Sequence, residues 1–184
     1  MVYFRGTLFQ DSYPGIFNSQ PESATDSKSY TIREIEADDA AKRFSTGEPL
    51  MDRYTLGDYY RWSTRENSLV IVLDYGGEIA AACHMLISEN RVTINMLARN
   101  RYAGMRGSGS RILDAAEDFA ASNLGIHEIR LEALDRENLV NFYLKKGYVM
   151  YREPFRDREW GFLCPMVKRI ASGTGQALEI DLDS

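Results

Sequence analysis

The sequence predicts a single mixed α/β (α+β) domain, and three observations support this fold class. Apolar runs separated by tight turns predict a meander of strands in the first half of the chain. One long segment then has apolar residues at helical spacing, and a strand, a short helix and two last strands follow it. The length of 184 residues suits one sizeable domain and is short for two.

The segment before the first strong apolar run predicts a strand and two helices. Residues 30–36 (YTIREIE) alternate imperfectly between apolar and polar and predict the first strand. Residues 37–44 suit a short helix, and Pro49 suits the start of a second helix. The apolar face of that second helix would consist of Leu50, Met51, Tyr54 and Leu56.

A strand, a turn and a strand come next. Residues 69–73 are an unbroken apolar run, residues 74–78 (DYGGE) supply a hairpin turn, and residues 79–87 return. Residues 92–97 predict one more strand. Residues 110–125 predict the long helix, because their apolar residues fall at helical spacing and the segment ends in a glycine.

The last third of the chain alternates between strands and a short helix. Residues 126–134 predict a strand, and residues 138–148 predict a helix that Gly147 ends. Residues 148–154 and 159–169 then predict a pair of strands. We therefore expect a domain over residues 30–170, preceded by a poorly ordered arm (1–29) and followed by an acidic tail (171–184).

Composition and charge restrict the function classes. The formal net charge is −5, so no overall positive field favours nucleic acid or a membrane, although a local basic patch still could. Cys83 and Cys164 lie in apolar runs and resemble neither a disulfide framework nor a metal site. No apolar run approaches the ~20 residues of a membrane span, and the first residues do not resemble a signal peptide. We expect a cytoplasmic protein without a metal and without a membrane partner.

A loop rich in glycine and arginine, residues 100–113 (NRYAGMRGSGSRIL), connects a predicted strand to the long helix. The first amides of a helix lack intrahelical partners, and glycine lets an anion approach them closely. The pattern therefore predicts a diphosphate site, to which Arg101, Arg106 and Arg111 would add charge; a flexible turn with solvated arginines is the alternative. The loop lacks the Gly-Lys-Ser/Thr ending of a nucleoside-triphosphate loop and does not open a dinucleotide fold.

Two segments together resemble the GNAT superfamily of acetyl-CoA-dependent N-acetyltransferases. In that family a strand leads into Gln/Arg-x-x-Gly-x-Gly/Ala, and a later helix carries Phe-Tyr-x-x-x-Gly-Phe/Tyr. The later motif here reads Phe142, Tyr143, Gly147 and Tyr148. The resemblance covers roughly residues 30–168. It implies the GNAT fold, a mixed, mostly antiparallel central sheet of roughly six to seven strands flanked by helices, with acetyl-CoA as co-substrate.

The resemblance also implies which residues bind coenzyme A. The two family glycines fall on Gly107 and Gly109, whereas the basic position falls on Gly104, so Arg106 or Arg101 must supply the charge. Arg136 stands where the family often has asparagine, with Asn138 nearby. The implied cofactor-binding residues are Leu97, Ala98, Arg99, Gly104, Met105, Arg106, Gly107, Ser108, Gly109, Ser110, Asn138 and Phe142.

Tyr143 is the catalytic residue that the resemblance implies, because the family's tyrosine lies by the thioester sulfur and protonates the departing thiolate. A phenol pKa near ~10 is close to that of a thiol, so the transfer would be nearly balanced. On spacing alone, a core or rim aromatic on a short helix is the better explanation of Tyr143, because buried aromatics greatly outnumber catalytic ones. Backbone N–H groups of Leu97 or Ala98 resemble the family's oxyanion donor.

No general base stands out in the sequence. His84 and His127 lie in predicted strands, where a satisfied structural histidine is the simpler interpretation. Glu89 and Asp74, both at strand ends, are weak candidates for a base.

The segment RFSTGEPLMDRYTL resembles part of the GNAT toxins that acetylate the amino group of aminoacyl-tRNA. The matching residues are Phe44, Gly47, Glu48, Pro49, Met51, Asp52, Tyr54 and Leu56. An α-amino group has a pKa near ~8, so little base is needed, but RNA demands cationic contacts. The arginines that would have to gather round the cleft are Arg53, Arg61, Arg65, Arg99, Arg101 and Arg106.

Other readings of the function remain open at this point. The early segment is also explained as a lid over a small amine or a peptide amine. A GNAT-shaped binding module without activity is a third hypothesis, because Gly104 replaces the basic residue. The partners that follow from the resemblance are coenzyme A, an amine acceptor, a second copy of the chain in a homodimer, and an antitoxin-type protein.

Overall fold

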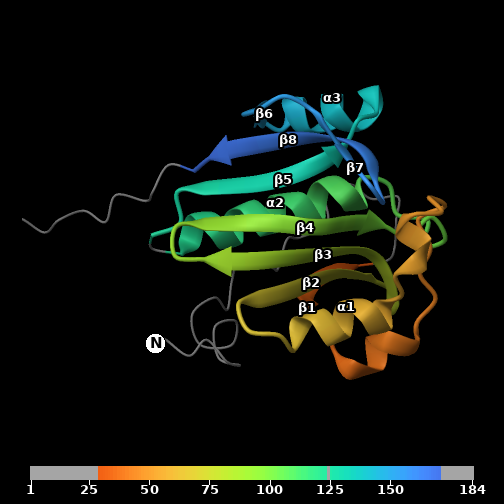
Figure 1. Ribbon diagram of the computed structural model, residues 1–184. Coiled ribbons are helices and arrows are strands. Elements are labelled where there is room, and N and C mark those ends of the chain that lie inside the picture. The colour runs from red at the N-terminus through yellow and green to blue at the C-terminus, as the bar shows by residue number, and fades with distance from the viewer. Residues whose placement is uncertain (1–28, 124, 171–184) are drawn as a thin grey trace, which may run out of the picture.

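The computed structural model describes residues 29–123 and 125–170, which build one eight-stranded sheet in the order β1-β2-β3-β4-β5-β8-β6, with β7 beside β8 (Figure 1). The strands are Tyr30–Glu34 (β1), Ser68–Tyr75 (β2), Glu78–Ser88 (β3), Arg91–Arg99 (β4), Glu128–Leu134 (β5), Val149–Met150 (β6), Phe155–Asp157 (β7) and Gly161–Arg169 (β8). Within the described ranges, β4 and β5 form the one parallel pair, and all other pairs are antiparallel. The predicted mixed, mostly antiparallel sheet with flanking helices is confirmed. The tail and all of the arm except residue 29 lie outside the described residues.

The sheet has more strands than the six to seven expected because residues 155–157 form a further short strand, β7, that was not predicted. The strand predicted at residues 148–154 is reduced to the two residues of β6, and β7 begins only after Pro154. Proline has no amide hydrogen to give to a strand ladder, so the pairing with β8 is interrupted there.

The helices are α1 (Leu56–Ser63), α2 (Ser108–Ser122) and α3 (Glu137–Lys145), with 3₁₀ turns at Ala37–Ala41 and Met51–Arg53. The helix expected from Pro49 begins later, because Thr55 caps α1: its side chain accepts from Asp58 N, and the Asp58 carboxylate accepts from Thr55 N at 2.8 Å. The helix expected over residues 37–44 is only the first 3₁₀ turn. Among the described residues, no helix is long and apolar enough to cross a bilayer.

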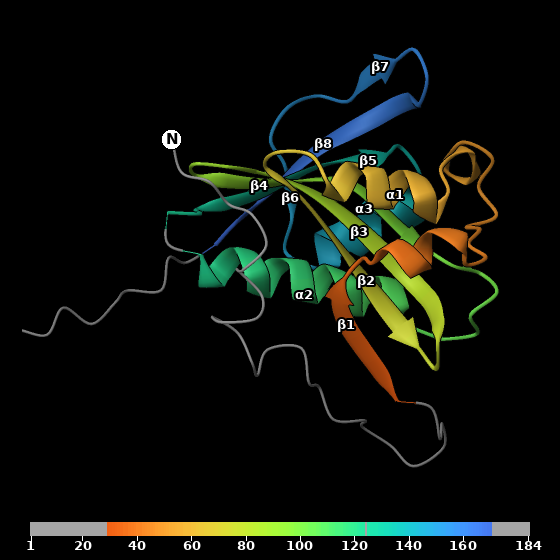
Figure 2. The same ribbon diagram turned by 90° about the horizontal axis from the view of Figure 1, so that it is seen from below.

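The helices cover both faces of the sheet, α1 on one face and α2 with α3 on the other (Figures 1 and 2). The apolar stripe of α2 is buried as predicted, with Ile112, Leu113 and Ala116 fully enclosed. Leu56 and Tyr59 of α1 bury the opposite face. Cys83 lies inside the core beneath α2, where burial raises the pKa of its thiol to about 12.

Strand β4 changes faces in the middle because it contains a β-bulge. Met85 pairs with Ile94 and His84 with Met96, so Asn95 is the extra residue. Val92 and Ile94 face the α2 side, whereas Met96 belongs to the core on the α1 side.

The pairing of β4 with β5 ends at the same place. Their register runs from Arg91 opposite Glu128 to Ile94 opposite Leu131. Beyond Ile94 the two strands diverge, as Figure 1 shows. The second half of β4 therefore presents one edge that β5 does not cover.

Asn100 fastens the loop after β4 to the segment before α1. Its Nδ2 donates to the carbonyl oxygens of Arg43 at 3.0 Å and Ile79 at 2.9 Å, and its Oδ1 accepts from Tyr102 N at 3.1 Å. The Ser45 carbonyl accepts from Arg101 N at 2.8 Å and strengthens this connection. Asn100 is buried, so these groups have little access to water as an alternative partner.

We expect Asn100→Ala to lower the free energy of unfolding by about 2–3 kcal/mol, because it leaves two carbonyl groups and two amides, those of Tyr102 and Ser45, without this partner. Urea denaturation followed by circular dichroism measures the change. Asn90→Ala, in the exposed turn between β3 and β4, is the control and should change the stability by less than about 0.5 kcal/mol. An equal effect of the two variants would contradict this role of Asn100.

Candidate active site

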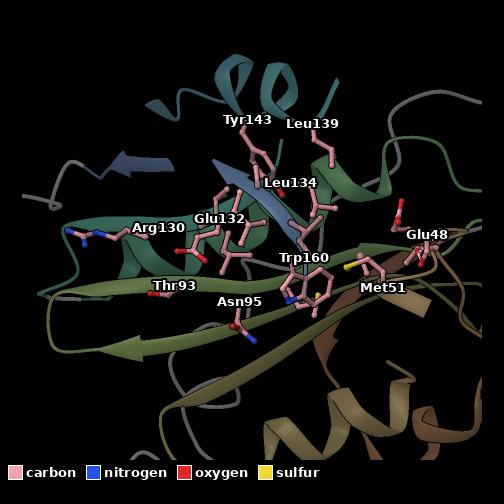
Figure 3. Close-up of a pocket in the computed structure, with 18 of the residues that line it drawn as sticks. Glu48, Met51, Thr93, Asn95, Arg130, Glu132, Leu134, Leu139, Tyr143 and Trp160 are labelled. Atoms are coloured by element: carbon pink, nitrogen blue, oxygen red, sulfur yellow. Dashed lines mark hydrogen bonds between the residues drawn. The ribbon is translucent and has the colours of Figure 1, made fainter. Parts of the chain in front are cut away.

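A cavity of about 580 Å³ lies where β4 and β5 diverge. Leu97, Ala98 and Arg99 line it from β4, and Tyr143 lines it from α3 (Figure 3). The cavity continues to the α1 side of the sheet, where Tyr54, Trp62 and Trp160 line it as well. It therefore connects the two faces of the sheet through the gap between the strands.

Tyr143 reaches this cavity from the buried face of α3. Its side chain points from the helix toward the strands in Figure 3, and only 8% of the residue is exposed. Phe142 and Tyr148 pack against its ring edge to face, with centroids 5.0 and 5.7 Å away. Burial raises the pKa of Tyr143, so its hydroxyl stays protonated at neutral pH.

Aromatic rings form the wall of the cavity on the α1 side. The Tyr54 ring stacks on Trp160 with centroids 6.1 Å apart, and Trp62 lies 5.3 Å from Tyr54. Trp62 also stacks on His84, at 5.0 Å. Planar rings at these distances give a rigid apolar surface, because each ring has few rotatable bonds and close neighbours.

His84 is a buried histidine with a partner at each ring nitrogen. Asn95 Nδ2 lies 3.1 Å from Nδ1, and Ser68 Oγ lies 2.9 Å from Nε2. An amide nitrogen can only donate, so Nε2 carries the hydrogen. Burial, with Arg65 as a second cause, lowers the pKa of His84 to about 4. His84 is therefore a satisfied neutral histidine, as expected, whereas His127 differs from the expectation because it is exposed and precedes β5.

The glycine loop offers groups that fit an anionic ligand. Gly107 caps α2 with a φ of 74°, and a Cβ added at Gly104, Gly107 or Gly109 would meet nothing within 4 Å. Ser108 Oγ is buried and has no hydrogen-bond partner among the described residues. A buried hydroxyl without a partner at a helix N-terminus is costly unless a ligand reaches it, which fits the diphosphate of coenzyme A.

The three arginines of this loop differ in what they contact. Arg101 donates to Tyr102 Oη at 2.6 Å, and Arg111 donates to Tyr30 Oη at 2.9 Å. Arg106 is exposed and makes no ion pair within residues 29–123 and 125–170. Of the two arginines that could supply the charge absent at Gly104, Arg106 is thus the one with its guanidinium available.

The predicted site residues divide into two groups. Leu97, Ala98, Arg99 and Tyr143 line one cavity. The predicted residues that do not line it are Gly104, Met105, Arg106, Gly107, Ser108, Gly109, Ser110, Asn138 and Phe142. Asn138 is exposed in the first turn of α3, and Phe142 is half-buried against the core.

The early segment that resembles the toxins folds around Asp52. Its carboxylate accepts from Thr46 N at 2.6 Å, Ser45 Oγ at 2.8 Å and Gly47 N at 3.2 Å. Although burial acts to raise it, these hydrogen bonds hold the pKa of Asp52 below its ordinary value. Glu48 forms an ion pair with Arg136, and Met51 and Tyr54 line the cavity.

The charged residues of the cavity differ from those expected. Asp74 is paired with Arg33 at 3.0 Å and Glu89 lies in the turn after β3, so neither candidate base lines the cavity. Glu132 of β5 does line it. The alternation of residues 128–134 indicates that Glu132 lies on the polar face of the strand, but the sequence does not indicate which face lines the cavity.

Most of the expected arginines also lie elsewhere. Of the six, Arg99 lines the cavity, while Arg53 pairs with Glu159 and Arg61 with Asp58. The arginines that line the cavity besides Arg99 are Arg91, Arg130 and Arg136. Arg91 and Arg130 were missed because their proximity depends on the register between β4 and β5, which the sequence does not reveal.

Residues 51–170 match the sequence model of the acetyltransferase (GNAT) domain. The chain belongs to the GNAT acetyltransferase family. No curated protein sequence matches the chain. As in the family, an acetyl-CoA co-substrate provides the acetyl group, and the enzyme is an N-acetyltransferase.

Solved structures share the fold of this GNAT chain at low sequence identity. The ribosomal-protein-S18-alanine N-acetyltransferase from Escherichia coli is 18% identical, covers 82% of this chain and 99% of its own, and has a TM-score of 0.63. The spermidine N-acetyltransferase from Vibrio cholerae, in complex with CoA and spermine, is 16% identical, covers 76% of this chain and 95% of its own, and has a TM-score of 0.60. A mutant AtaT toxin bound to the C-terminus of the antitoxin AtaR and acetyl-CoA is 19% identical, covers 76% of this chain and 92% of its own, and has a TM-score of 0.56.

We expect Arg106→Gln to weaken coenzyme A binding about tenfold, because a charge-assisted hydrogen bond to a phosphate is lost. Isothermal titration calorimetry measures the dissociation constant. Arg61→Gln, on α1 at the other face of the sheet, is the control and should bind as the wild type does. An unchanged affinity of Arg106→Gln would show that this guanidinium does not meet the diphosphate.

Proposed function

We propose that the cavity between β4 and β5 is the place where an amine attacks acetyl-CoA, with Tyr143 serving the departing sulfur. The observation that carries this proposal is the single cavity lined both by Tyr143 and by the open edge of β4. A thioester laid along that edge would be accessible to an amine arriving from the α1 side. The acceptor that we propose is the α-amino group of aminoacyl-tRNA.

The glycine loop would hold the cofactor by its diphosphate. Ser108 Oγ, the first amides of α2 and the Arg106 guanidinium are the groups available for this role. Bound acetyl-CoA supplies an acetyl thioester, which an amine can attack. Leu97 and Ala98 lie on the part of β4 beyond its pairing with β5, so a backbone N–H there would donate to the thioester carbonyl oxygen.

Tyr143 would act on the sulfur as it leaves. Burial raises the pKa of its phenol, so the proton is present at neutral pH but a phenolate in the same apolar surroundings is costly. Full transfer of the proton, which ordinary pKa values would make nearly balanced, is therefore unfavourable in this site. Tyr143 would donate a hydrogen bond that strengthens as negative charge grows on the sulfur.

Glu132 would accept the proton that the attacking amine loses. Its carboxylate lines the cavity (Figure 3), and Arg152 Nη2, which lies outside the cavity lining, donates to it at 2.9 Å. The other carboxylate of the lining, Glu48, is engaged with Arg136. As the C–N bond forms and the C–S bond breaks, one proton passes from nitrogen to Glu132. The coenzyme A thiolate departs while it accepts the hydrogen bond from Tyr143, and it takes up its own proton from solvent.

The early segment supports aminoacyl-tRNA as the acceptor. Thr46, Glu48, Met51 and Tyr54, which belong to the toxin-like stretch, line the α1 side of the cavity. An α-amino group, with a pKa near ~8, is partly neutral at pH 7 and requires only a weak base such as a solvated carboxylate. A small amine or a peptide amine is the alternative acceptor, with the same segment acting as a lid.

We expect Tyr143→Phe to lower kcat at least about 100-fold while the dissociation constant of coenzyme A changes less than about threefold. The phenyl ring preserves the packing against Phe142 and Tyr148 and removes only the hydroxyl. Steady-state kinetics with an accepted amine and calorimetry with coenzyme A measure the two quantities. A kcat within threefold of the wild type would remove Tyr143 from this role.

Charged tRNA incubated with the enzyme and labelled acetyl-CoA tests the acceptor. We expect label on the aminoacyl group and none on uncharged tRNA, because only the charged form offers an α-amine. Growth arrest on expression of the wild type, relieved in Tyr143→Phe, is the expected consequence in cells. Label on spermidine or an alanyl peptide, with none on charged tRNA, would favour the alternative acceptor.

A further inference from the structure

The cavity carries more positive than negative charge, although the whole chain has a net charge of −5. Four arginines and two glutamates line it: Arg91, Arg99, Arg130, Arg136, Glu48 and Glu132. A local excess of cations on an acidic protein does not follow from composition. It indicates that the ligand of this cavity has anionic groups. The diphosphate of coenzyme A would account for anionic groups near the glycine loop, but not for anionic groups elsewhere in the cavity.

The charged pairs show where the excess lies. Glu48 pairs with Arg136, and Arg152, which does not line the cavity, donates to Glu132. Arg130 pairs with Glu128 at 2.7 Å, yet its Nε is buried and finds no hydrogen-bond partner in the part of the chain that the structure describes. Arg91 forms no ion pair with any residue that the structure describes.

Arg91 and Arg130 come together at the end of the cavity away from the glycine loop. They lie at the beginnings of β4 and β5, where Arg91 pairs in register with Glu128 and Thr93 with Arg130. The neighbouring residues Val92, Ile94, Ile129 and Leu131 face the α2 core, so both arginines belong to the opposite face of the sheet. Figure 3 shows Arg130 and Thr93 at one end of the cavity and Glu48 and Met51 at the other.

The Arg130 guanidinium is also held in place. Its Cζ lies 5.0 Å from the centroid of the Tyr151 ring, and Tyr151 lines the same cavity. A guanidinium packed against a ring has fewer conformations to lose when it binds a planar or tetrahedral anion. One carboxylate, that of Glu128, cannot neutralise both arginines.

We infer that the amine acceptor carries a carboxylate or a phosphate, which Arg91 and Arg130 bind while the amine reaches Glu132. This inference rests on the proposed function, because the proposed place of the amine defines one end of the acceptor. Glu132 and Arg130 are two residues apart on the same face of β5, about 7 Å between Cα atoms. The amine and the anion of the acceptor are therefore separated by a few bonds, and a polycation such as spermidine is disfavoured by repulsion from the arginines.

The inference is tested by binding, which does not require turnover. The probes are four N-acetylated dipeptide amides that resemble products: acetyl-Ala-Asp, acetyl-Ala-Asn, acetyl-Ala-phosphoserine and acetyl-Ala-Ser. Calorimetry with the coenzyme A complex gives their dissociation constants. We expect each anionic peptide to bind at least about tenfold more tightly than its neutral counterpart. The larger of the two ratios identifies carboxylate or phosphate as the preferred group.

Arginine variants locate the effect. In Arg91→Gln and Arg130→Gln the ratio of anionic to neutral binding should fall toward one, whereas Arg130→Lys should keep part of it because the charge remains. Arg156→Gln, in exposed β7 and away from the cavity lining, is the matched control and should keep the full ratio. Thermal unfolding of every variant confirms that the fold persists.

Two results would overturn the inference: equal binding of charged and neutral peptides to the wild type, or a full ratio in the Arg91→Gln/Arg130→Gln double variant. The free amines of the same dipeptides test the proposed function separately. Selective binding of anionic products without acetylation of any amine would refute the proposed reaction and leave the anion site standing. Acetylation of neutral and anionic amines with equal kcat/KM, together with equal binding of their products, would support the proposed reaction and refute the anion site.

Discussion

The separation of β4 from β5 is the constraint on which the rest of the site depends. Parallel pairing holds the strands together only from Arg91 to Ile94, and the bulge at Asn95 then turns β4. If the ladder continued, the edge of β4 would be used by β5, and Tyr143 would face a closed sheet. Because the ladder stops, backbone groups of β4 that would otherwise bond to β5 are available to a ligand, and one cavity connects the two faces of the sheet.

The bulge also explains why two different environments meet at the same place. On the α2 side, Tyr143 lies among Phe142, Tyr148 and the core, where burial raises its pKa. On the α1 side, Glu132 is nearly half exposed and paired with Arg152. The phenol of Tyr143 therefore lies in an apolar setting, and the carboxylate of Glu132 lies in a solvated one. The sheet keeps them apart except at the gap between its strands.

The sequence predicts the elements that have their own period and fails where the position depends on pairing. Helix α2 and the β2–β3 hairpin have clear apolar patterns and turns, so they could be predicted closely. Val92, Ile94, Met96 and Ala98 alternate without interruption, which indicates one buried face, yet the bulge sends the first two and the last two to opposite cores. Tyr143 was found through its motif, whereas Arg91, Arg130 and Glu132 could not be found, because strand register brings them together.

Some residues of the toxin-like segment stabilise the segment itself, and others line the cavity. The resemblance therefore does not by itself identify the acceptor. Asp52 satisfies amides and hydroxyls of its own loop, and Leu56, the first residue of α1, is buried against the sheet. Such residues set where the loop lies, and any acceptor could use a loop in that place. Met51 and Tyr54 line the cavity but are apolar or aromatic, so they provide shape more than charge recognition. In the reaction that we propose, discrimination among amines would therefore come from charged groups on the strands, where the pair Arg91 and Arg130 would favour an anionic acceptor and repel a cationic one.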